Sequence, residues 1–182
     1  MRPPGLFLLA GDPGRRGGRR RPRRGGARAR IGLARPCVAY VGAASRDSRP
    51  FFLWISALLR GAGAGAVRLA PLAGRRADPA LAREIVADAD AVFISGGDVD
   101  LGMGILNSTG LCEPLRRLHR GGMPFIGLSA GSIMLARLWV RWADEKDDDS
   151  AAPFPCLGLA PLLCDTHGEG EDWRELRTLL RL

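Results

Sequence analysis

The sequence predicts a three-layer α/β domain built on a doubly wound, mostly parallel β-sheet. Short continuous apolar segments, typical of strands buried on both faces, alternate along the chain with segments of helical spacing. Ser129 stands between an apolar run and a segment without helix breakers, and glycines flank it two positions away on each side. That arrangement is typical of a sharp strand-to-helix turn. With 182 residues, the chain suits a single domain over residues 1–182.

Each element follows from a local pattern. Residues 51–59 have helical spacing, and Asp78 followed by Pro79 is typical of a helix start, with an N-cap and a proline in the first position. The expected strands are short apolar runs at Leu6–Ala10, Cys37–Val41, Ala66–Leu69, Ala91–Ile94 and Pro124–Leu128. The carboxyl ends of parallel strands share one edge of a sheet, where such folds bind ligands. Gly96, Gly97 and Ser129 are therefore expected on that edge.

Composition limits the classes of function. The chain is 46% hydrophobic and 25% charged, as in ordinary soluble proteins. No apolar run approaches the roughly 20 residues of a membrane span, and Leu6–Ala10 is too short for a signal-peptide core. We expect a cytoplasmic protein without a membrane partner. The four cysteines are widely spaced, so we expect free thiols and neither a disulfide framework, a metal site nor a cofactor.

The positive charge is confined to one segment. The net charge is +8, but residues 1–36 hold eleven arginines and one acid, which leaves residues 37–182 with a net charge of −2. The Arg/Gly/Pro-rich tract cannot bury apolar area, so we expect a flexible insertion at about 13–35. It lacks interleaved aromatics, which argues against dedicated nucleic-acid binding. The oligomeric state is not predicted.

Ser129 in this turn has the form of a nucleophile elbow, in which glycines let the strand and helix backbones approach closely. A serine nucleophile needs a base. Of the two histidines, His167 follows an apolar run at the end of an element and is favoured over His119, which lies near a helix end. For the acid that orients the imidazole, Asp144 is the first choice, and Glu145 and Asp165 are the alternatives.

Three segments together resemble a known family: the strand 91–94 with Ser95-Gly96-Gly97-Asp98, the elbow 127–131, and the segment from Gly158-Leu159-Ala160-Pro161 to Asp165-Thr166-His167. They occur in this order in the dipeptidase E and cyanophycinase family of serine peptidases. The resemblance implies a flavodoxin-like sheet similar to class I glutamine amidotransferase domains.

The resemblance also implies a Ser-His-Asp/Glu peptidase acting on small peptides. It assigns Ser129 as the nucleophile and His167 as the base, with the backbone N–H groups of Gly97 and Ala130 as oxyanion donors. Asp144 falls where the dipeptidase branch carries its acid. In that branch an arginine after the histidine recognises an acidic N-terminal residue of the substrate, and Arg174 or Arg177 is the candidate here.

Two differences from the family pattern concern the substrate and the chain end. Val99-Asp100-Leu101 replaces the usual Asn/Asp-Thr-Phe after the glycine pair, which predicts a different substrate-facing loop. The chain stops at Leu182, one helix after His167, where members of the family continue, which favours a fragment or a shortened branch. The alternative function is a non-catalytic or differently acting amidotransferase-like domain that keeps the elbow as architecture.

Overall fold

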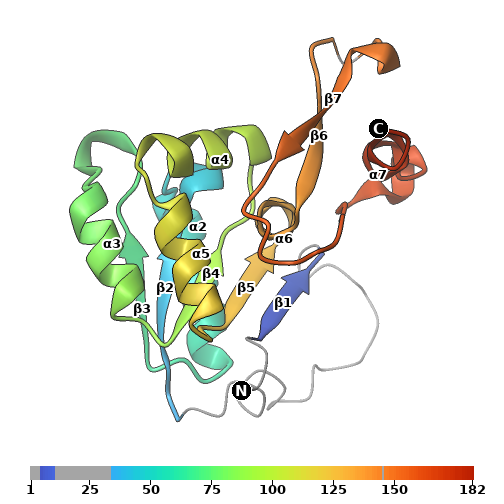
Figure 1. Cartoon of the computed structure of the whole chain (residues 1–182). Coiled ribbons are helices and arrows are strands. Elements are labelled where there is room, and N and C mark those ends of the chain that lie inside the picture. The colour runs from blue at the N-terminus through green and yellow to red at the C-terminus, as the bar shows by residue number, and fades with distance from the viewer. Residues whose placement is uncertain (1–4, 11–33, 145) are drawn as a thin grey trace.

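The computed structural model describes residues 5–10, 34–144 and 146–182 of the chain. Its centre is a five-stranded sheet in the order β1-β5-β4-β2-β3, and every neighbouring pair is parallel (Figure 1). The strands are β1 Leu6–Leu9, β2 Cys37–Val41, β3 Ala66–Ala70, β4 Ala91–Ile94 and β5 Phe125–Leu128. All five expected strands form, with ends within one residue of the predicted ones, and the α/β fold class is confirmed.

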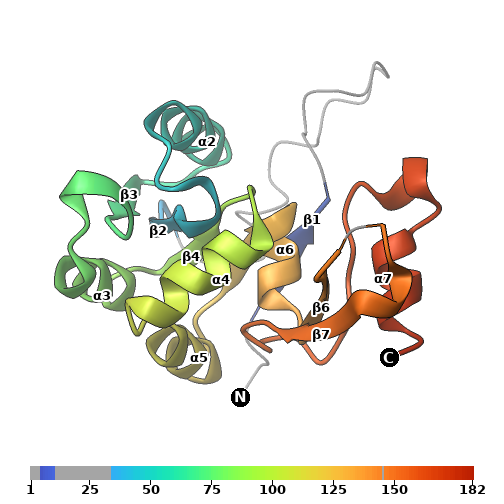
Figure 2. The same cartoon turned by 90° about the horizontal axis from the view of Figure 1, so that it is seen from above.

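Helices cover both faces of the sheet. Seen from above, α2 lies on one face and α3, α4 and α5 lie on the other (Figure 2). The helices are α2 Arg49–Gly61, α3 Pro79–Ala87, α4 Val99–Ser108, α5 Cys112–Arg120, α6 Ala130–Leu135 and α7 Arg174–Leu179. Short 3₁₀ turns occupy Ala43–Ser45, Gly74–Arg76, Asp148–Ser150 and Gly168–Glu171. The chain runs from β2 to β3 on one side and then to β4 on the other, so strand order reverses at β2.

Two aspartates begin the helices that follow β3 and β4. The carboxylate of Asp78 accepts the backbone N–H of Leu81 at 3.0 Å, as the sequence predicts for an N-cap. Asp98 does the same for Leu101 at 2.8 Å. Val99–Leu101 therefore form the first turn of α4, because the Asp98 cap continues the chain directly into the helix.

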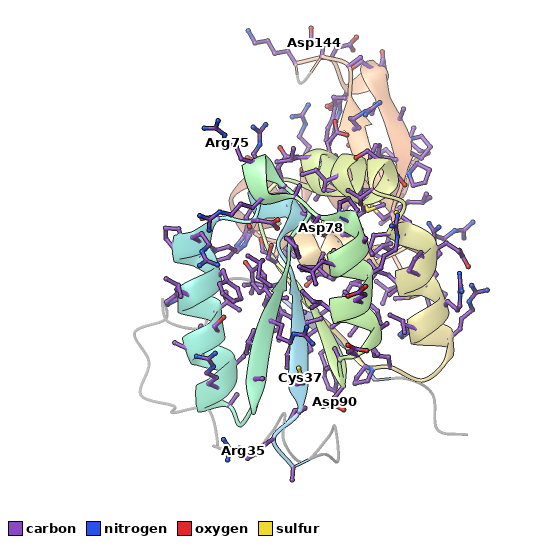
Figure 3. All side chains as sticks on the ribbon, turned by 90° about the vertical axis from the view of Figure 1, so that its left-hand side faces the viewer. Arg35, Cys37, Arg75, Asp78, Asp90 and Asp144 are labelled. Carbon is purple, nitrogen blue, oxygen red and sulfur yellow. The ribbon has the colours of Figure 1, made fainter. Side chains whose placement is uncertain are left out.

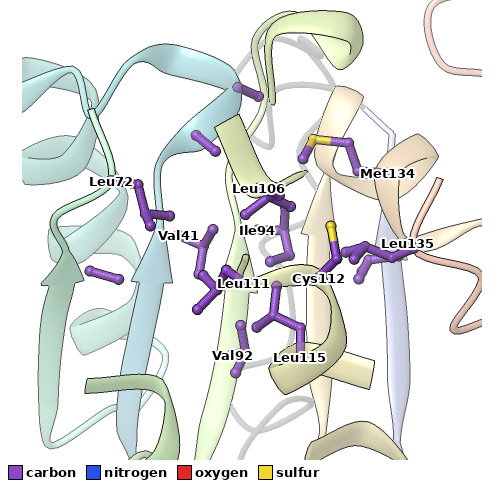
Figure 4. Packing of buried hydrophobic residues seen from close by; sticks show 14 of the residues in the cluster. Val41, Leu72, Val92, Ile94, Leu106, Leu111, Cys112, Leu115, Met134 and Leu135 are labelled. Carbon is purple, nitrogen blue, oxygen red and sulfur yellow. The ribbon is translucent and has the colours of Figure 1, made fainter. Parts of the chain in front are cut away.

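Two apolar clusters hold the layers together. On one face, Val41 and Ile94 of the sheet pack with Leu106 of α4 and Leu115 of α5, all fully buried (Figure 4). On the other face, Tyr40, Phe93 and other strand residues pack against Ile55 of α2. Each large side chain of this kind contributes about 1.5–3 kcal/mol when removed from water. The sheet edge above β2, β4 and β5 is thus fixed from both sides.

An antiparallel hairpin that the sequence did not predict follows α6. Its strands, β6 Leu138–Trp142 and β7 Ala151–Pro155, form a separate two-stranded sheet beyond the edge of the central one (Figure 1). Helix α7 lies against it, and the indole N–H of Trp139 donates to the carboxylate of Glu175 at 2.8 Å. This contact ties the segment after His167 to the hairpin.

Other sequence expectations concern thiols, membranes and the arginine tract. All four cysteines are free, as predicted, and Cys112 and Cys156 are buried. Burial raises the pKa of Cys156 to about 12. Within the described ranges no helix is long and apolar enough to cross a membrane. The insertion predicted at about 13–35 lies almost wholly outside the residues that the structure describes.

Candidate active site

Ser129 occupies the sharp turn between β5 and α6. Its backbone angles are φ 51° and ψ −122°, and α6 begins at the next residue, Ala130. A positive φ is unusual for a residue with a side chain and costs of the order of 1–3 kcal/mol, which the surrounding structure must supply. The predicted nucleophile-elbow geometry is confirmed.

The two flanking glycines leave room for this turn. A Cβ on Gly127 would lie 2.7 Å from backbone atoms of Ser132, and one on Gly131 would lie 2.2 Å from the carbonyl oxygen of Ile94 in β4. Both distances are far below van der Waals contact. The glycines therefore allow α6 to pack directly on the strand ends, as the sequence argument requires.

The edge strand β1 forms hydrogen bonds with two serines of the elbow segment. The backbone N–H of Ser129 donates to the carbonyl of Leu9 at 2.7 Å. The hydroxyl of Ser132 accepts the N–H of Leu9 at 3.1 Å and lies 2.9 Å from the carbonyl oxygen of Gly127. Ser132 thus joins β1 to β5 at the turn, a role that the sequence analysis missed.

His167 meets Ser129 at the sheet edge. Its Nε2 lies 3.0 Å from Ser129 Oγ, within hydrogen-bond distance. His167 has a positive φ of 66° and precedes the 3₁₀ turn that begins at Gly168. By contrast, His119 is buried in α5, where its ring packs edge-on against Phe125 at 5.5 Å between ring centroids. Of the two histidines, the structure therefore places the predicted base, and not the alternative, beside the serine.

An open cleft of about 410 Å³ lies over this pair, and Gly96, Gly97 and Leu128 form its floor with Ser129 and His167. It lies where the strand order reverses, which is the usual ligand site of doubly wound sheets. Gly97 has φ 141°, and a Cβ there would lie 2.0 Å from the carbonyl oxygen of Ala44. Only glycine fits this backbone position beside the serine.

The structure does not bring the first-choice acid, Asp144, to His167. Asp144 lies in the turn between β6 and β7, at the far tip of the hairpin (Figure 3). Its Oδ1 accepts the backbone N–H of Lys146 at 3.0 Å, so the carboxylate closes its own turn. No hydrogen bond joins it to His167 within the described residues. Glu145, an alternative acid, lies outside the residues that the structure describes.

Asp165, the other alternative, lies on the segment that carries His167. Its Oδ1 accepts the N–H of Thr166 at 2.6 Å. Its Oδ2 is buried and has no hydrogen-bond partner among the described residues. This oxygen lies 2.9 Å from the position that a Cβ on Gly168 would take, so the carboxylate faces the residue that follows the histidine.

The predicted substrate arginine lies elsewhere. The guanidinium of Arg174 stacks over the ring of Trp142 at 4.9 Å, and its Nε donates to Asp148 Oδ1 at 3.0 Å. These contacts place it on the hairpin side of α7, and it does not line the cleft over Ser129. Arg177 pairs with Asp172. The hairpin supplies the partners of Arg174, and the sequence analysis did not predict that hairpin.

A model of Peptidase family S51 matches residues 27–179. The chain belongs to peptidase family S51. This match covers the sheet, the elbow and the histidine segment, and it confirms the resemblance to the dipeptidase E family.

Individual relatives agree with the family. The chain is 38% identical over 80 residues to Peptidase E of Streptomyces coelicolor, covering 44% of this chain and 32% of the relative. It is 32% identical over 91 residues to Peptidase E of Shewanella amazonensis, covering 50% and 37%. The matched parts thus span about a third of these relatives' length. A solved peptidase from an acI-B1 Actinobacterium shares the fold, with a TM-score of 0.69, 20% identity, and coverage of 97% of this chain and 75% of that one.

Two aromatic residues of the cleft were not predicted as site residues. Phe51 and Trp54 of α2 line it together with Ser129 and His167. The sequence shows them only as part of a helical pattern, and aromatic side chains at such spacing usually belong to a core. Their partial exposure is visible only when the helix is placed on the sheet.

Proposed function

We propose that this protein is a serine peptidase that hydrolyses small peptides, with Ser129 as the nucleophile and His167 as the general base. The observation that carries the proposal is the 3.0 Å contact between Ser129 Oγ and His167 Nε2 at a strained elbow. A serine and a base at hydrogen-bond distance, on the ligand-binding edge of the sheet, form the minimal unit for acyl transfer. Family membership gives the reaction class.

The reaction proceeds in two halves. His167 Nε2 takes the proton of Ser129 Oγ as the oxygen attacks the peptide carbonyl carbon, and the same imidazolium then protonates the leaving amine. Water attacks the acyl-serine in the second half, its proton passes to His167, and the imidazolium returns that proton to Ser129 Oγ as the bond between Oγ and the acyl carbon breaks. The carboxylic acid product and free Ser129 result.

Backbone N–H groups stabilise the negative charge that develops on the carbonyl oxygen. Gly97 and Ala130 border Ser129, and within the described residues neither backbone N–H donates a hydrogen bond to the protein. Two such donors are worth several kcal/mol to a tetrahedral intermediate. We assign them the oxyanion role that the sequence predicts.

For the orienting acid we place Asp165 ahead of Asp144. Asp165 lies two residues from His167, and its second carboxylate oxygen is buried and unpartnered among the described residues, whereas the Asp144 carboxylate closes the hairpin turn. A buried acceptor without a partner is costly unless a donor reaches it. We propose that the imidazole Nδ1–H of His167 supplies this donor in the working enzyme.

A small fluorophosphonate probe tests the proposal. Ser129 Oγ attacks phosphorus and displaces fluoride only if it is activated, so we expect one label per chain in the wild type and none in Ser129→Ala. Ser108→Ala, an exposed change on α4 away from the cleft, should keep the label. A folded wild type that resists labelling would instead support the alternative of a non-catalytic domain that keeps the elbow as architecture.

A further inference from the structure

Two aromatic side chains line the cleft together with Ser129 and His167. Phe51 and Trp54 lie one turn apart on α2, and their rings stack at 5.8 Å between centroids with an interplanar angle of 19°. The Trp54 side chain is 41% exposed, and Phe51 is half-buried. Neighbouring exposed aromatic rings that face a cleft offer an apolar surface that a ligand can cover.

The rest of the lining is neutral. Ser45, Ser48 and the two glycines, Gly96 and Gly97, also line the cleft. Apart from His167, the cleft residues in the described part of the chain carry no ionisable side chain. The nearby Arg49 places its guanidinium over the ring of Phe52, which does not line the cleft, at 5.9 Å.

An acidic substrate side chain would need a cation here. Arg174, predicted for this role, instead stacks on Trp142 and binds Asp148. No cation among the described cleft residues would pair with a carboxylate that is desolvated against two aromatic rings, whereas an apolar side chain is stabilised by the apolar surface that it buries. The aromatic surface of Phe51 and Trp54 therefore disfavours an acidic substrate side chain and favours an apolar one.

The geometry points to a substrate with an apolar or aromatic side chain beside the scissile bond, which packs on Phe51 and Trp54. The proposal rests on the serine peptidase function above and names its substrate class. Dipeptides such as Phe-Ala bind in preference to Asp-Ala, because the Phe side chain covers the exposed Trp54 ring. A single such contact in an apolar pocket discriminates by roughly 10-fold to 200-fold.

The test is protection of Ser129 from the fluorophosphonate probe during a labelling time too short for much of the dipeptide to be hydrolysed, so that the protection reports how well each dipeptide occupies the site. We expect Phe-Ala to protect at a concentration at least about tenfold lower than Asp-Ala does. In Trp54→Ala this advantage should fall to about twofold or less. Leu53→Ala is the matched control, because Leu53 is 62% exposed on the same helix and does not line the cleft.

The outcomes separate the two proposals. Labelling of Ser129 with equal or better protection by Asp-Ala overturns the apolar substrate class and leaves the serine peptidase intact. An unchanged Phe-Ala preference in Trp54→Ala also overturns it. Absence of labelling in the folded wild type overturns both.

Discussion

Ser129 Oγ and His167 Nε2 lie 3.0 Å apart although 38 positions separate the two residues along the chain. The serine is fixed by the strand-to-helix turn, and the histidine arrives on a segment that α7 and the hairpin hold in place. The contact between Ser129 and His167 therefore depends on two backbone segments, each of which is held in place by a different part of the fold.

The first prediction concerns the base. In His167→Gln, the side chain can still make a hydrogen bond to Ser129 but cannot take its proton at neutral pH, so we expect kcat to fall by roughly 10⁴-fold to 10⁶-fold. The measurement is steady-state hydrolysis of a dipeptide that the wild type cleaves. The urea midpoint should stay near that of the wild type, since His167 is exposed. Activity within about tenfold of the wild type would exclude His167 as the base.

The second prediction separates the two described acids. Asp165→Asn should lower kcat severely, by up to about 10⁴-fold, because the imidazole loses the carboxylate that selects its tautomer. KM and the urea midpoint should change little, which a purely structural role would not explain.

Asp144→Asn is the matched control, with the same change at the hairpin tip, and should keep nearly full turnover. The reverse pattern, with Asp144→Asn inactive and Asp165→Asn active, would show that the hairpin turn moves to His167 during catalysis.

The third prediction concerns the glycine behind the elbow. Gly131→Ala places a methyl group 2.2 Å from the carbonyl oxygen of Ile94, so we expect a loss of at least about 1–3 kcal/mol in the free energy of unfolding. Urea denaturation measures it. The control is Gly104→Ala in the exposed face of α4, where no atom lies within 4 Å of the new methyl group. That variant should gain about 0.5–1 kcal/mol. Similar effects at both positions would contradict the close approach of α6 to β4.

The fourth prediction concerns pH and stability. Burial raises the pKa of Glu175, against the opposing effect of its hydrogen bond from Trp139. A carboxyl with a raised pKa binds its proton more tightly in the folded state than in the unfolded state. Its contribution to stability is therefore largest at low pH and is lost as the pH rises from the ordinary carboxyl range through the raised value.

Glu175→Gln keeps an acceptor for Trp139 and cannot ionise. Its urea midpoint should fall less than that of the wild type between about pH 4 and about pH 7. Glu84→Gln, an exposed change on α3, should follow the wild-type curve. A steeper fall in Glu175→Gln than in the wild type would reverse the assigned sign.

Much of the central sheet could be predicted from sequence because β2, β4 and β5 are buried on both faces and are therefore continuous apolar runs. The elbow was predictable as well, because glycines are needed two positions before and two positions after Ser129, where the backbones of the strand and the helix approach each other closely. The hairpin was not predictable, because Ala151–Pro155 contains two prolines and does not alternate apolar with polar residues. The positions of Asp144 and Arg174 were not predictable either, since both side chains find hydrogen-bond partners on that hairpin and neither lines the cleft.

The contact between Leu9 and Ser129 makes the first strand part of the catalytic geometry. The carbonyl that holds the Ser129 N–H belongs to a segment 120 positions earlier, joined to the rest of the sheet through the arginine-rich tract. The elbow therefore reaches its final conformation only when β1 has docked on β5, a long-range and entropically slow closure. Docking of the edge strand therefore supplies one of the supports of the elbow, and a chain in which β1 is detached would lack it.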